Sequence, residues 1–457
     1  STKIFLATLL LGSAVQIVFA EGPLTIKGLR GPEWRAKSAP VFRSMADGKH
    51  YTAVVEGGRA IVKYQYSNGQ AVDTLLNLDK VKPGDGVELN GLRIQGYSLS
   101  EDEQRLLVYS NADYVYRRSF KADYYYYVIG RQNFKRVSPD KIMAATLAPD
   151  GRQIAFAKDN NLYVSKVMDA SINLTERQIT TDGKWNEIIN GIPDWVYEEE
   201  FSMNQAFCWS IDSKFVCYIK FDESKVKEYT LPFYRGMNPS FDEYELYPGN
   251  YSYKYPVAGE TNSTVSVWSY NVETRKTQKI DVPLDADGYI PRVRYTQDPT
   301  KLAVMTFNRH QNDFKMYLAD PASGVAKMVI EDKNEQYVSE GNMDDIQFYP
   351  DGFTFVSEKD GFRHLYYYNM SGALQRQITK GNYDVTRIYG YDSKTKTAYV
   401  QTAYLGEGAT MPAELTRGIY KVDAAGKMIP LFNGGKDGKG CRGTHSAHFS
   451  KGFVYMQ

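Results

Sequence analysis

One short unit recurs along most of this sequence. It consists of an aromatic or small residue, a turn rich in Pro, Asp or Gly, and then an apolar strand. Eight copies are found, near Asp47, Asp102, Asp150, Asp212, Asp298, Asp351, Asp392 and Lys451. The spacing is mostly close to the roughly 40 to 60 residues of one four-stranded blade. The pattern predicts an all-β fold, an eight-bladed β-propeller with an incomplete last blade. A pair of β-sandwiches is the alternative, but sandwiches need no recurring turn.

Two of the intervals between turns are longer than the others, 150–212 and 212–298. The first contains the stretch GKWNEIINGIPDWVYEEEF, in which Pro193-Asp194 is a helix start signal. We therefore expect an acidic helical insertion near residues 185–201 of a propeller domain that covers residues 41–457.

The first 20 residues have the pattern of a secretory signal peptide. Lys3 precedes an apolar run, and Val18-Phe19-Ala20 is a small-residue cleavage pattern. A membrane anchor is the alternative, but the run is short and is interrupted by polar residues and glycine. No second apolar stretch of spanning length follows. We expect an exported protein, periplasmic, secreted or at the cell surface, with no membrane span after signal removal.

Charge and cysteine content exclude some classes of partner and scaffold. The formal net charge is +1, with no basic run that could follow a phosphate backbone, so we expect no nucleic-acid partner. The three cysteines, Cys208, Cys217 and Cys441, are too few for a disulfide scaffold. A two-residue loop at Asp212-Ser213 would place Cys208 opposite Cys217, either as a cross-strand disulfide or as two buried thiols.

Three adjacent carboxylates, Glu198, Glu199 and Glu200, follow a Trp and a Tyr in the insertion. Successive helical residues do not face each other, so at most two can converge on one ligand. Two carboxylates in a cavity repel each other unless a cation is present. No Asp-x-Asp-x-Asp pattern that could bind calcium lies nearby. The histidines do not have the spacing of zinc ligands, apart from the pair His445 and His448. We expect no metal and no cofactor, and favour a substrate ammonium group as the cation.

The segment DWVYEEE, followed at a distance by YPVAGETN, resembles the signature of the dipeptidyl peptidase IV branch of the prolyl oligopeptidase family. Further segments carry the likeness, among them NADYVYRRSFKADYYYY and EKDGFRHLYYYN, and it extends from about residue 90 to the end. The resemblance implies an eight-bladed propeller joined to an α/β-hydrolase domain. It also implies release of dipeptides from free N-termini when Pro, or less well Ala, is second.

The resemblance also assigns residues. Glu199 and Glu200 are similar to the pair that binds the substrate ammonium. Arg117 is similar to the arginine that binds a substrate carbonyl and braces the glutamates, and Arg118 beside it is the less favoured alternative. The planar, always protonated guanidinium suits that role. Three residues are expected to position the insertion rather than to touch substrate: Asp194, Trp195 and Tyr197.

The family's nucleophile lies in a Gly-x-Ser-x-Gly pentapeptide, which is absent from these 457 residues. We therefore expect a hydrolase domain with a Ser-Asp-His triad after residue 457, and no hydrolysis by this chain alone. Residues 21–40 are expected to pack on that domain. The interval 212–298 matches a protruding loop through which family members form homodimers. A non-catalytic propeller that binds peptides and a tripeptidyl peptidase are the alternatives.

Overall fold

The computed structural model describes residues 25–31, 41–84, 86–131, 133–167, 174–237, 246–403, 417–432 and 444–457. The chain divides into two compact units, Ser1–Val41 and Phe42–Gln457. In the first unit the described residues form the short helix α1 (Ile26–Leu29), which Thr25 caps by accepting a hydrogen bond from the Gly28 N–H. The predicted signal peptide lies outside the described residues, as does most of segment 21–40.

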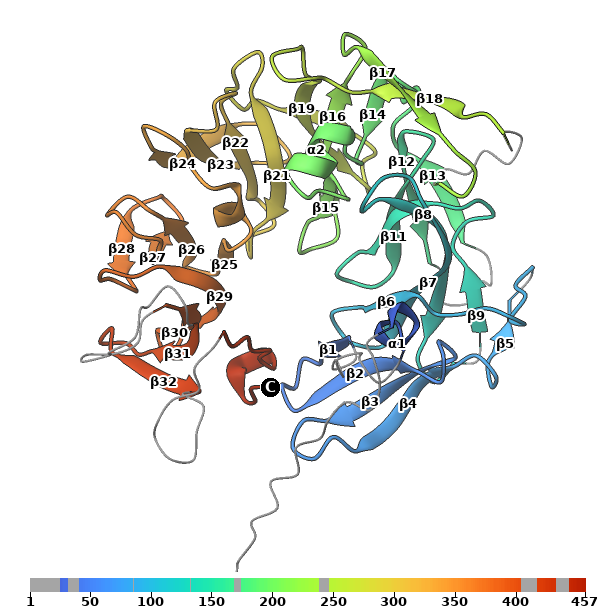
Figure 1. Ribbon diagram of the computed structural model, residues 1–457, viewed down its shortest axis with the longest axis horizontal. Coiled ribbons are helices and arrows are strands. Elements are labelled where there is room, and N and C mark those ends of the chain that lie inside the picture. Colours follow the sequence, from blue (N-terminus) through green and yellow to red (C-terminus); the bar gives the residue numbers. More distant parts are fainter. Residues whose placement is uncertain are drawn as a thin grey trace, which may run out of the picture. The chain divides into compact units, whose positions relative to one another are not determined.

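The second unit is built of antiparallel sheets that follow one another in chain order around a ring (Figure 1). Blade one contains β1 (Phe42–Ser44), β2 (His50–Val55), β3 (Ala60–Gln65) and β4 (Ala71–Asn77). Blade two contains β6 (Gly96–Leu99), β7 (Arg105–Tyr114), β8 (Phe120–Val128) and β9 (Asn133–Arg136), with β5 (Lys82–Pro83) parallel to β9. Blade three contains β10 (Met143–Leu147), β11 (Gln153–Lys158), β12 (Asn161–Lys166) and β13 (Thr175–Gln178).

Blade four differs from the others because a helix and a hairpin interrupt it. Its sheet contains β14 (Ile188–Asn190), β15 (Phe207–Trp209), β16 (Phe215–Asp222), β19 (Thr264–Asn271) and β20 (Thr277–Ile280). The helix α2 (Trp195–Glu200) lies between β14 and β15 in sequence. The separate two-stranded sheet of β17 (Glu228–Phe233) and β18 (Gly249–Lys254) lies between β16 and β19 in sequence. These two insertions account for the two long intervals between turns.

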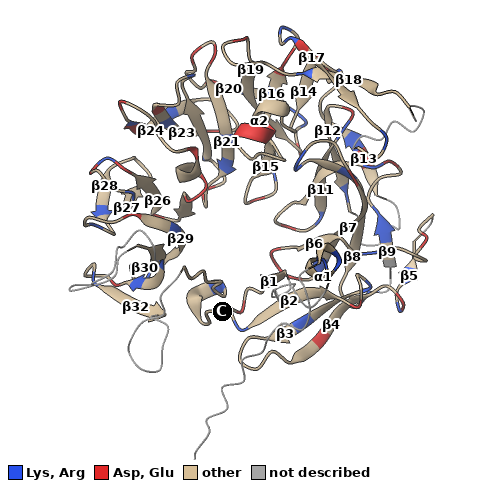
Figure 2. Ribbon diagram, in the orientation of Figure 1, with Lys and Arg blue, Asp and Glu red and all other residues tan. Residues whose placement is uncertain are grey.

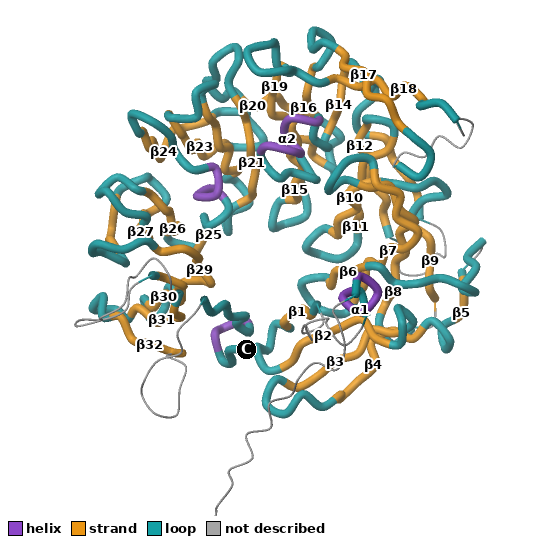
Figure 3. Tube along the Cα trace, in the orientation of Figure 1, coloured by secondary structure: helices purple, strands orange, loops and turns teal. Residues whose placement is uncertain are grey.

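The remaining blades are regular four-stranded sheets. Blade five contains β21 (Tyr289–Tyr295), β22 (Leu302–Phe307), β23 (Asp313–Ala319) and β24 (Ala326–Lys333). Blade six contains β25 (Gln347–Tyr349), β26 (Gly352–Ser357), β27 (His364–Asn369) and β28 (Leu374–Gln377). Blade seven contains β29 (Val385–Asp392), β30 (Thr397–Thr402), β31 (Gly418–Val422) and β32 (Met428–Phe432). The 3-10 helices η2 (Glu340–Met343) and η4 (Lys451–Phe453) lie outside the sheets, and Figure 3 shows how little of the described chain is helical.

The recurring aspartate has a direct structural role in the turns. In six of the seven blades its Oδ1 accepts a hydrogen bond from the backbone N–H two residues later, at 2.8 to 3.3 Å. Such a turn connects the first two strands of a blade tightly. The second strand then runs through the core, and β22 and β26 are buried along their whole length. Burial on both faces explains why these strands are apolar without alternation.

The predicted number of blades is wrong. The described residues form seven blades, and the eighth turn makes one isolated bridge, between Phe449 and Met456, rather than a sheet. The bridge lies in a short hairpin around η4, which we call the closing hairpin (residues 448–457). It contacts the first blade: the Ser44 hydroxyl lies 3.1 Å from His448 Nε2, and the rings of Phe42 and His448 are 4.3 Å apart.

The two cysteines of blade four are opposite each other, as the sequence predicted. Cys208 on β15 pairs in register with Cys217 on β16, and both are free thiols. The sulfur of Cys217 lies 3.1 Å from the hydroxyl of Tyr295. Burial raises the pKa of the Cys208 thiol to about 12, so the thiols are neutral and pack as small apolar groups. Cys441 lies outside the described residues.

Candidate functional site

The predicted acidic helix is present as α2 and begins where the sequence placed its start signal. Asp194 is the N-cap residue, and its side chain accepts a hydrogen bond from the Tyr197 N–H at 2.9 Å. Its second carboxylate oxygen accepts one from the Ser263 hydroxyl at 2.5 Å. Burial raises the pKa of Asp194, and these bonds oppose that shift. The cap fixes the first turn of a helix that is too short to form on its own.

Tyr197 anchors α2 in the core between two blades. Its side chain is 1% exposed and its ring packs against Phe201 and Phe221 at centroid distances of 5.3 and 4.9 Å. Its hydroxyl accepts a hydrogen bond from the backbone N–H of Ile290 on β21 at 3.0 Å. Trp195 faces another way, with its ring 4.1 Å from that of Tyr255. Both aromatic residues therefore position the helix.

The first glutamate of the run is enclosed in the protein. Glu198 is 1% exposed, and its carboxylate accepts hydrogen bonds from the backbone N–H groups of Arg118 (2.5 Å) and Ser119 (2.8 Å) and from the Ser119 hydroxyl (2.5 Å). The Arg118 guanidinium donates to the backbone carbonyl of Glu198 at 3.1 Å. Glu198 thus binds the connection between β7 and β8 to α2, a role that no sequence argument had assigned to it.

The second glutamate is paired with the predicted arginine. Arg117 donates to Glu199 through Nε at 3.0 Å and through a terminal nitrogen at 2.7 Å, a two-pronged contact across 82 residues of sequence. The Arg117 side chain is 69% exposed and that of Glu199 is 27% exposed. Arg118 is farther away, at 3.8 Å from Glu199. The favoured arginine is therefore the one with the fork geometry that carboxylates match best.

The third glutamate, Glu200, is the last residue of α2 and is exposed. Within the described ranges no ion pair or hydrogen bond occupies its side chain. Figure 2 shows the helix as a red segment next to β15 and β21. Carboxylates at a helix C-terminus are unfavourable because that end of the helix is negative. Arg292 offsets this by donating to the carbonyl of Phe201, the C-cap residue, at 2.7 Å.

A further segment lies within electrostatic reach of Glu200. The Tyr337 hydroxyl donates to the carboxylate of Glu340, and burial together with Glu340 and Glu200 raises the pKa of Tyr337 to about 12. Arg292 connects the same region to the helix by a two-pronged pair with Asp344, at 2.9 and 3.0 Å. The sequence signal for Arg292 was weak: alternation of arginine with apolar residues in YIPRVRY.

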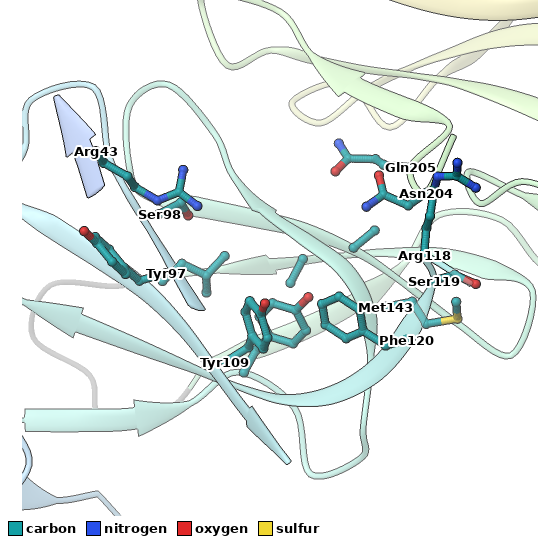
Figure 4. A pocket seen from close by; sticks show the side chains of 14 residues that line it. Arg43, Tyr97, Ser98, Tyr109, Arg118, Ser119, Phe120, Met143, Asn204 and Gln205 are labelled. Carbon is teal, nitrogen blue, oxygen red and sulfur yellow. The ribbon is translucent and has the colours of Figure 1, made fainter. Parts of the chain in front are cut away.

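A cavity of about 320 Å³ adjoins the connection between β7 and β8. Arg118 and Ser119 line it on one side, Arg43 and Tyr97 on the other, and Tyr109 lies between them (Figure 4). No Asp or Glu is among the lining residues. Arg43 and Arg118 give this lining a positive charge, and Arg118 also lies 3.8 Å from the carboxylate of Glu199.

Every residue predicted for the site is thus part of one cluster around α2. In the ranges that the structure describes, no group of three or more His, Cys, Asp or Glu side chains could hold a metal ion. In the same ranges no helix is long and apolar enough to cross a bilayer.

Comparisons with known proteins identify the family. The model of the family described as "Dipeptidyl peptidase IV (DPP IV) N-terminal region" matches residues 100–457. The crystal structure of Porphyromonas gingivalis dipeptidyl peptidase 4 is 40% identical, with a TM-score of 0.84, over 95% of this chain and 58% of that chain.

Curated fungal relatives are more distant. "Probable dipeptidyl peptidase 4" of Aspergillus flavus is 29% identical over 80% of this chain and 46% of its own length. "Dipeptidyl peptidase 4" of Trichophyton rubrum is 27% identical over 87% of this chain and 49% of its own length. The chain thus spans about half the length of the curated relatives it matches. Since the family model covers most of its residues, the chain belongs to the dipeptidyl peptidase IV N-terminal region family.

Proposed function

We propose that this propeller is the substrate-measuring part of a serine exopeptidase similar to dipeptidyl peptidase IV. In this proposal Glu199 and Glu200 bind the free N-terminal ammonium of a peptide, and Arg117 binds the carbonyl that follows. A separate hydrolase domain with a Ser-Asp-His triad then releases X-Pro or X-Ala dipeptides. A fixed distance between ammonium and nucleophile restricts cleavage to one bond, which is specificity by positioning.

One observation carries the proposal. Of the three adjacent carboxylates, Glu198 accepts hydrogen bonds from N–H and O–H groups of the protein, and Glu199 is paired with Arg117. Glu200 has no partner within the described ranges. An ammonium group carries several donors on a compact charge and would supply what Glu200 lacks while sharing Glu199. Arg117, being largely exposed, retains donor capacity for a carbonyl oxygen.

Further features support the rest of the assignment. The 457 residues contain no Gly-x-Ser-x-Gly pentapeptide, so the nucleophile would come from another domain, and we expect the 457-residue chain to release no product. The apolar N-terminal segment with its cleavage pattern supports export, to the periplasm, the cell surface or the medium. The hairpin of β17 and β18 supports assembly as a homodimer, because exposed apolar side chains directly precede β18.

The test compares two chromogenic substrates on the protein expressed from its complete reading frame. Gly-Pro-anilide has a free ammonium, and its N-acetylated form differs only in lacking that charge. We expect cleavage of the free amine alone and, in Glu200→Gln, a rise of about tenfold in KM. Glu187→Gln, which alters an exposed ion pair with Lys184, is the matched control and should behave as the unmodified protein. Cleavage of both substrates would contradict ammonium recognition.

A binding measurement separates the enzyme from a non-catalytic propeller. Calorimetric titration of this chain with Gly-Pro and with N-acetyl-Gly-Pro reports recognition without chemistry. Binding of the free dipeptide together with no turnover in the full-length protein would favour the peptide-binding module. Release of tripeptides instead of dipeptides from a peptide with Pro at its third position would favour the tripeptidyl alternative.

A further inference from the structure

A second and larger cavity lies behind the connection that carries Arg117. Its volume is about 540 Å³, and its walls come from the end of β7 and the residues after it, from the segment before α2, and from the hairpin strand β18. The lining residues that matter here are one acid and four aromatic residues: Glu223, Tyr114, Tyr116, Trp185 and Tyr251. No residue of the glutamate cluster, Glu198, Glu199 or Glu200, is among them.

The aromatic residues of this cavity include two that are unusually exposed. The side chain of Trp185 is 59% exposed and that of Tyr114 is 52% exposed, while Tyr116 and Tyr251 lie deeper. Large aromatic side chains at the mouth of a cavity cost solvation free energy unless a ligand covers them. The faces of such rings attract cations, and Trp attracts them most strongly.

The acid of this cavity has no partner in the described part of the chain. Glu223 is 6% exposed, and no described residue donates a hydrogen bond to its carboxylate or forms an ion pair with it. The nearby lysine, Lys254, instead donates to the backbone carbonyl of Val226 at 2.7 Å. A buried carboxyl group without donors is costly in either protonation state, and most buried polar groups are therefore bonded.

The other charged residues of the lining, Asp113, Lys121, Asp159 and Lys184, are all exposed. Asp113 forms an ion pair with Lys141 at 2.6 Å, and Lys184 forms one with Glu187. The buried charge that remains available to a ligand is therefore that of Glu223. A carboxylate at depth beneath aromatic rings is complementary to a cation with an apolar surface, and a small inorganic cation would leave the rings uncovered.

We propose that this cavity is a second ligand site, which binds an organic ammonium ion with alkyl substituents. The ammonium charge lies against the Glu223 carboxylate, and its alkyl groups contact Tyr116, Tyr251 and the mouth residues Trp185 and Tyr114. The site differs from the one around Glu199 and Glu200, because it selects charge and apolar surface rather than N–H donors. A quaternary ammonium ion, which has no N–H donor, distinguishes the two.

Ligand binding to this site is coupled to a proton. Burial, and secondarily Asp194, raises the pKa of Glu223 to about 8, with Asp222 acting in the same direction and Lys254 against it. Tyr116 is the facing group on the other wall, and its own pKa is raised by burial. At neutral pH the ligand binds as Glu223 releases its proton to solvent. Affinity therefore rises between pH 6 and pH 9, and in Glu223→Gln this pH dependence is lost.

The test is calorimetric titration of the full chain with choline and with 3,3-dimethylbutan-1-ol, a neutral molecule of the same shape. We expect saturable binding of choline, at least tenfold weaker binding of the alcohol, and at least tenfold weaker binding of choline to Glu223→Gln. Glu223→Gln removes the negative charge with little change of shape, because an amide resembles the protonated carboxyl group. Trp185→Ala, at an exposed position, should weaken choline binding about threefold, and Trp185→Phe should retain most of it.

One control variant tests whether the two sites are independent. Arg117→Ala, which alters the glutamate cluster, should leave choline binding unchanged if the cavity is an independent site. Absence of choline binding to the unmodified chain, equal binding to Glu223→Gln, or equal binding of the neutral alcohol would each overturn the proposal. A changed choline affinity in Arg117→Ala, in either direction, would also overturn it, since the cation would then occupy the cluster around Glu199.

Discussion

Ser119 donates both its backbone N–H and its hydroxyl to the carboxylate of Glu198, at 2.8 and 2.5 Å. The two residues are 79 positions apart in sequence and come from different blades. Both are buried, at 4% and 1% exposure. The contact therefore fixes the connection that carries Arg117 relative to the helix that carries Glu199 and Glu200. None of these three side chains takes part in it.

Loss of this contact should destabilise the fold. In Glu198→Ala the buried N–H groups of Arg118 and Ser119 lose their acceptor, so we expect the free energy of unfolding to fall by about 3 kcal/mol. Urea unfolding followed by tryptophan fluorescence measures it. Glu187→Ala, which removes an exposed ion pair, should cost less than about 0.5 kcal/mol. If both variants lose the same small amount of unfolding free energy, Glu198 does not stabilise the contact between the blades.

Replacement of Arg117 by lysine should impair substrate binding while leaving the fold intact. Lysine keeps the charge but lacks the planar fork, so Glu199 loses one of its two contacts and the substrate carbonyl loses a directed donor. We expect KM for Gly-Pro-anilide to rise about tenfold in the full-length protein, with an unchanged melting temperature. Arg152→Lys, at an exposed turn of the third blade, is the control. Unchanged KM in Arg117→Lys would remove Arg117 from the proposed site.

The hairpin of β17 and β18 should control the oligomeric state. Leu246 and Tyr247, which precede β18, are 89% and 76% exposed, an unfavourable situation for a monomer in water. We expect the unmodified protein to be a dimer and the double variant Leu246→Asp with Tyr247→Asp to be a monomer, by light scattering after size exclusion. Val325→Asp, at an exposed apolar position of blade five, should remain dimeric. A monomeric unmodified protein would contradict the proposed homodimer.

Stability should depend on pH through Glu223. Its pKa is raised from 4.5 in the unfolded chain to about 8 in the fold. The folded state therefore retains a proton that the unfolded state releases, and stability falls as pH rises from about 4.5 to about 8. Glu223→Gln lacks this effect, so relative to the unmodified chain it should gain about 4 kcal/mol between pH 5 and pH 9. If the unfolding free energies of the unmodified chain and of Glu223→Gln change with pH in parallel, Glu223 is ionised when buried.

The sequence predicted those parts of the structure that depend on local chemistry. The turn aspartates accept hydrogen bonds from N–H groups two residues away, so their spacing alone located the blades. The start of α2 was predicted for the same reason, because Asp194 caps it locally. The pairing of Arg117 with Glu199 was inferred from family resemblance, since nothing local connects residues 82 positions apart.

Other features could not be predicted because they depend on distant contacts. Glu198 had the same sequence context as its neighbours, and its burial results from donors that another blade provides. Arg292 and its contact with the end of α2 depend on how blade five packs against blade four. The number of blades was overcounted because a turn signal marks the first two strands only, and the eighth copy has a turn without a sheet.

The closing hairpin gives the ring a particular order of assembly. The contact between Ser44 and His448 connects residues 404 positions apart, whereas contacts within a blade connect residues that are close in sequence. The entropy cost of closing a loop grows with its length, so blades can form early and one by one, and the contact between first blade and hairpin comes last. Hydrogen exchange should therefore begin at this seam, which makes it the point where the ring opens first.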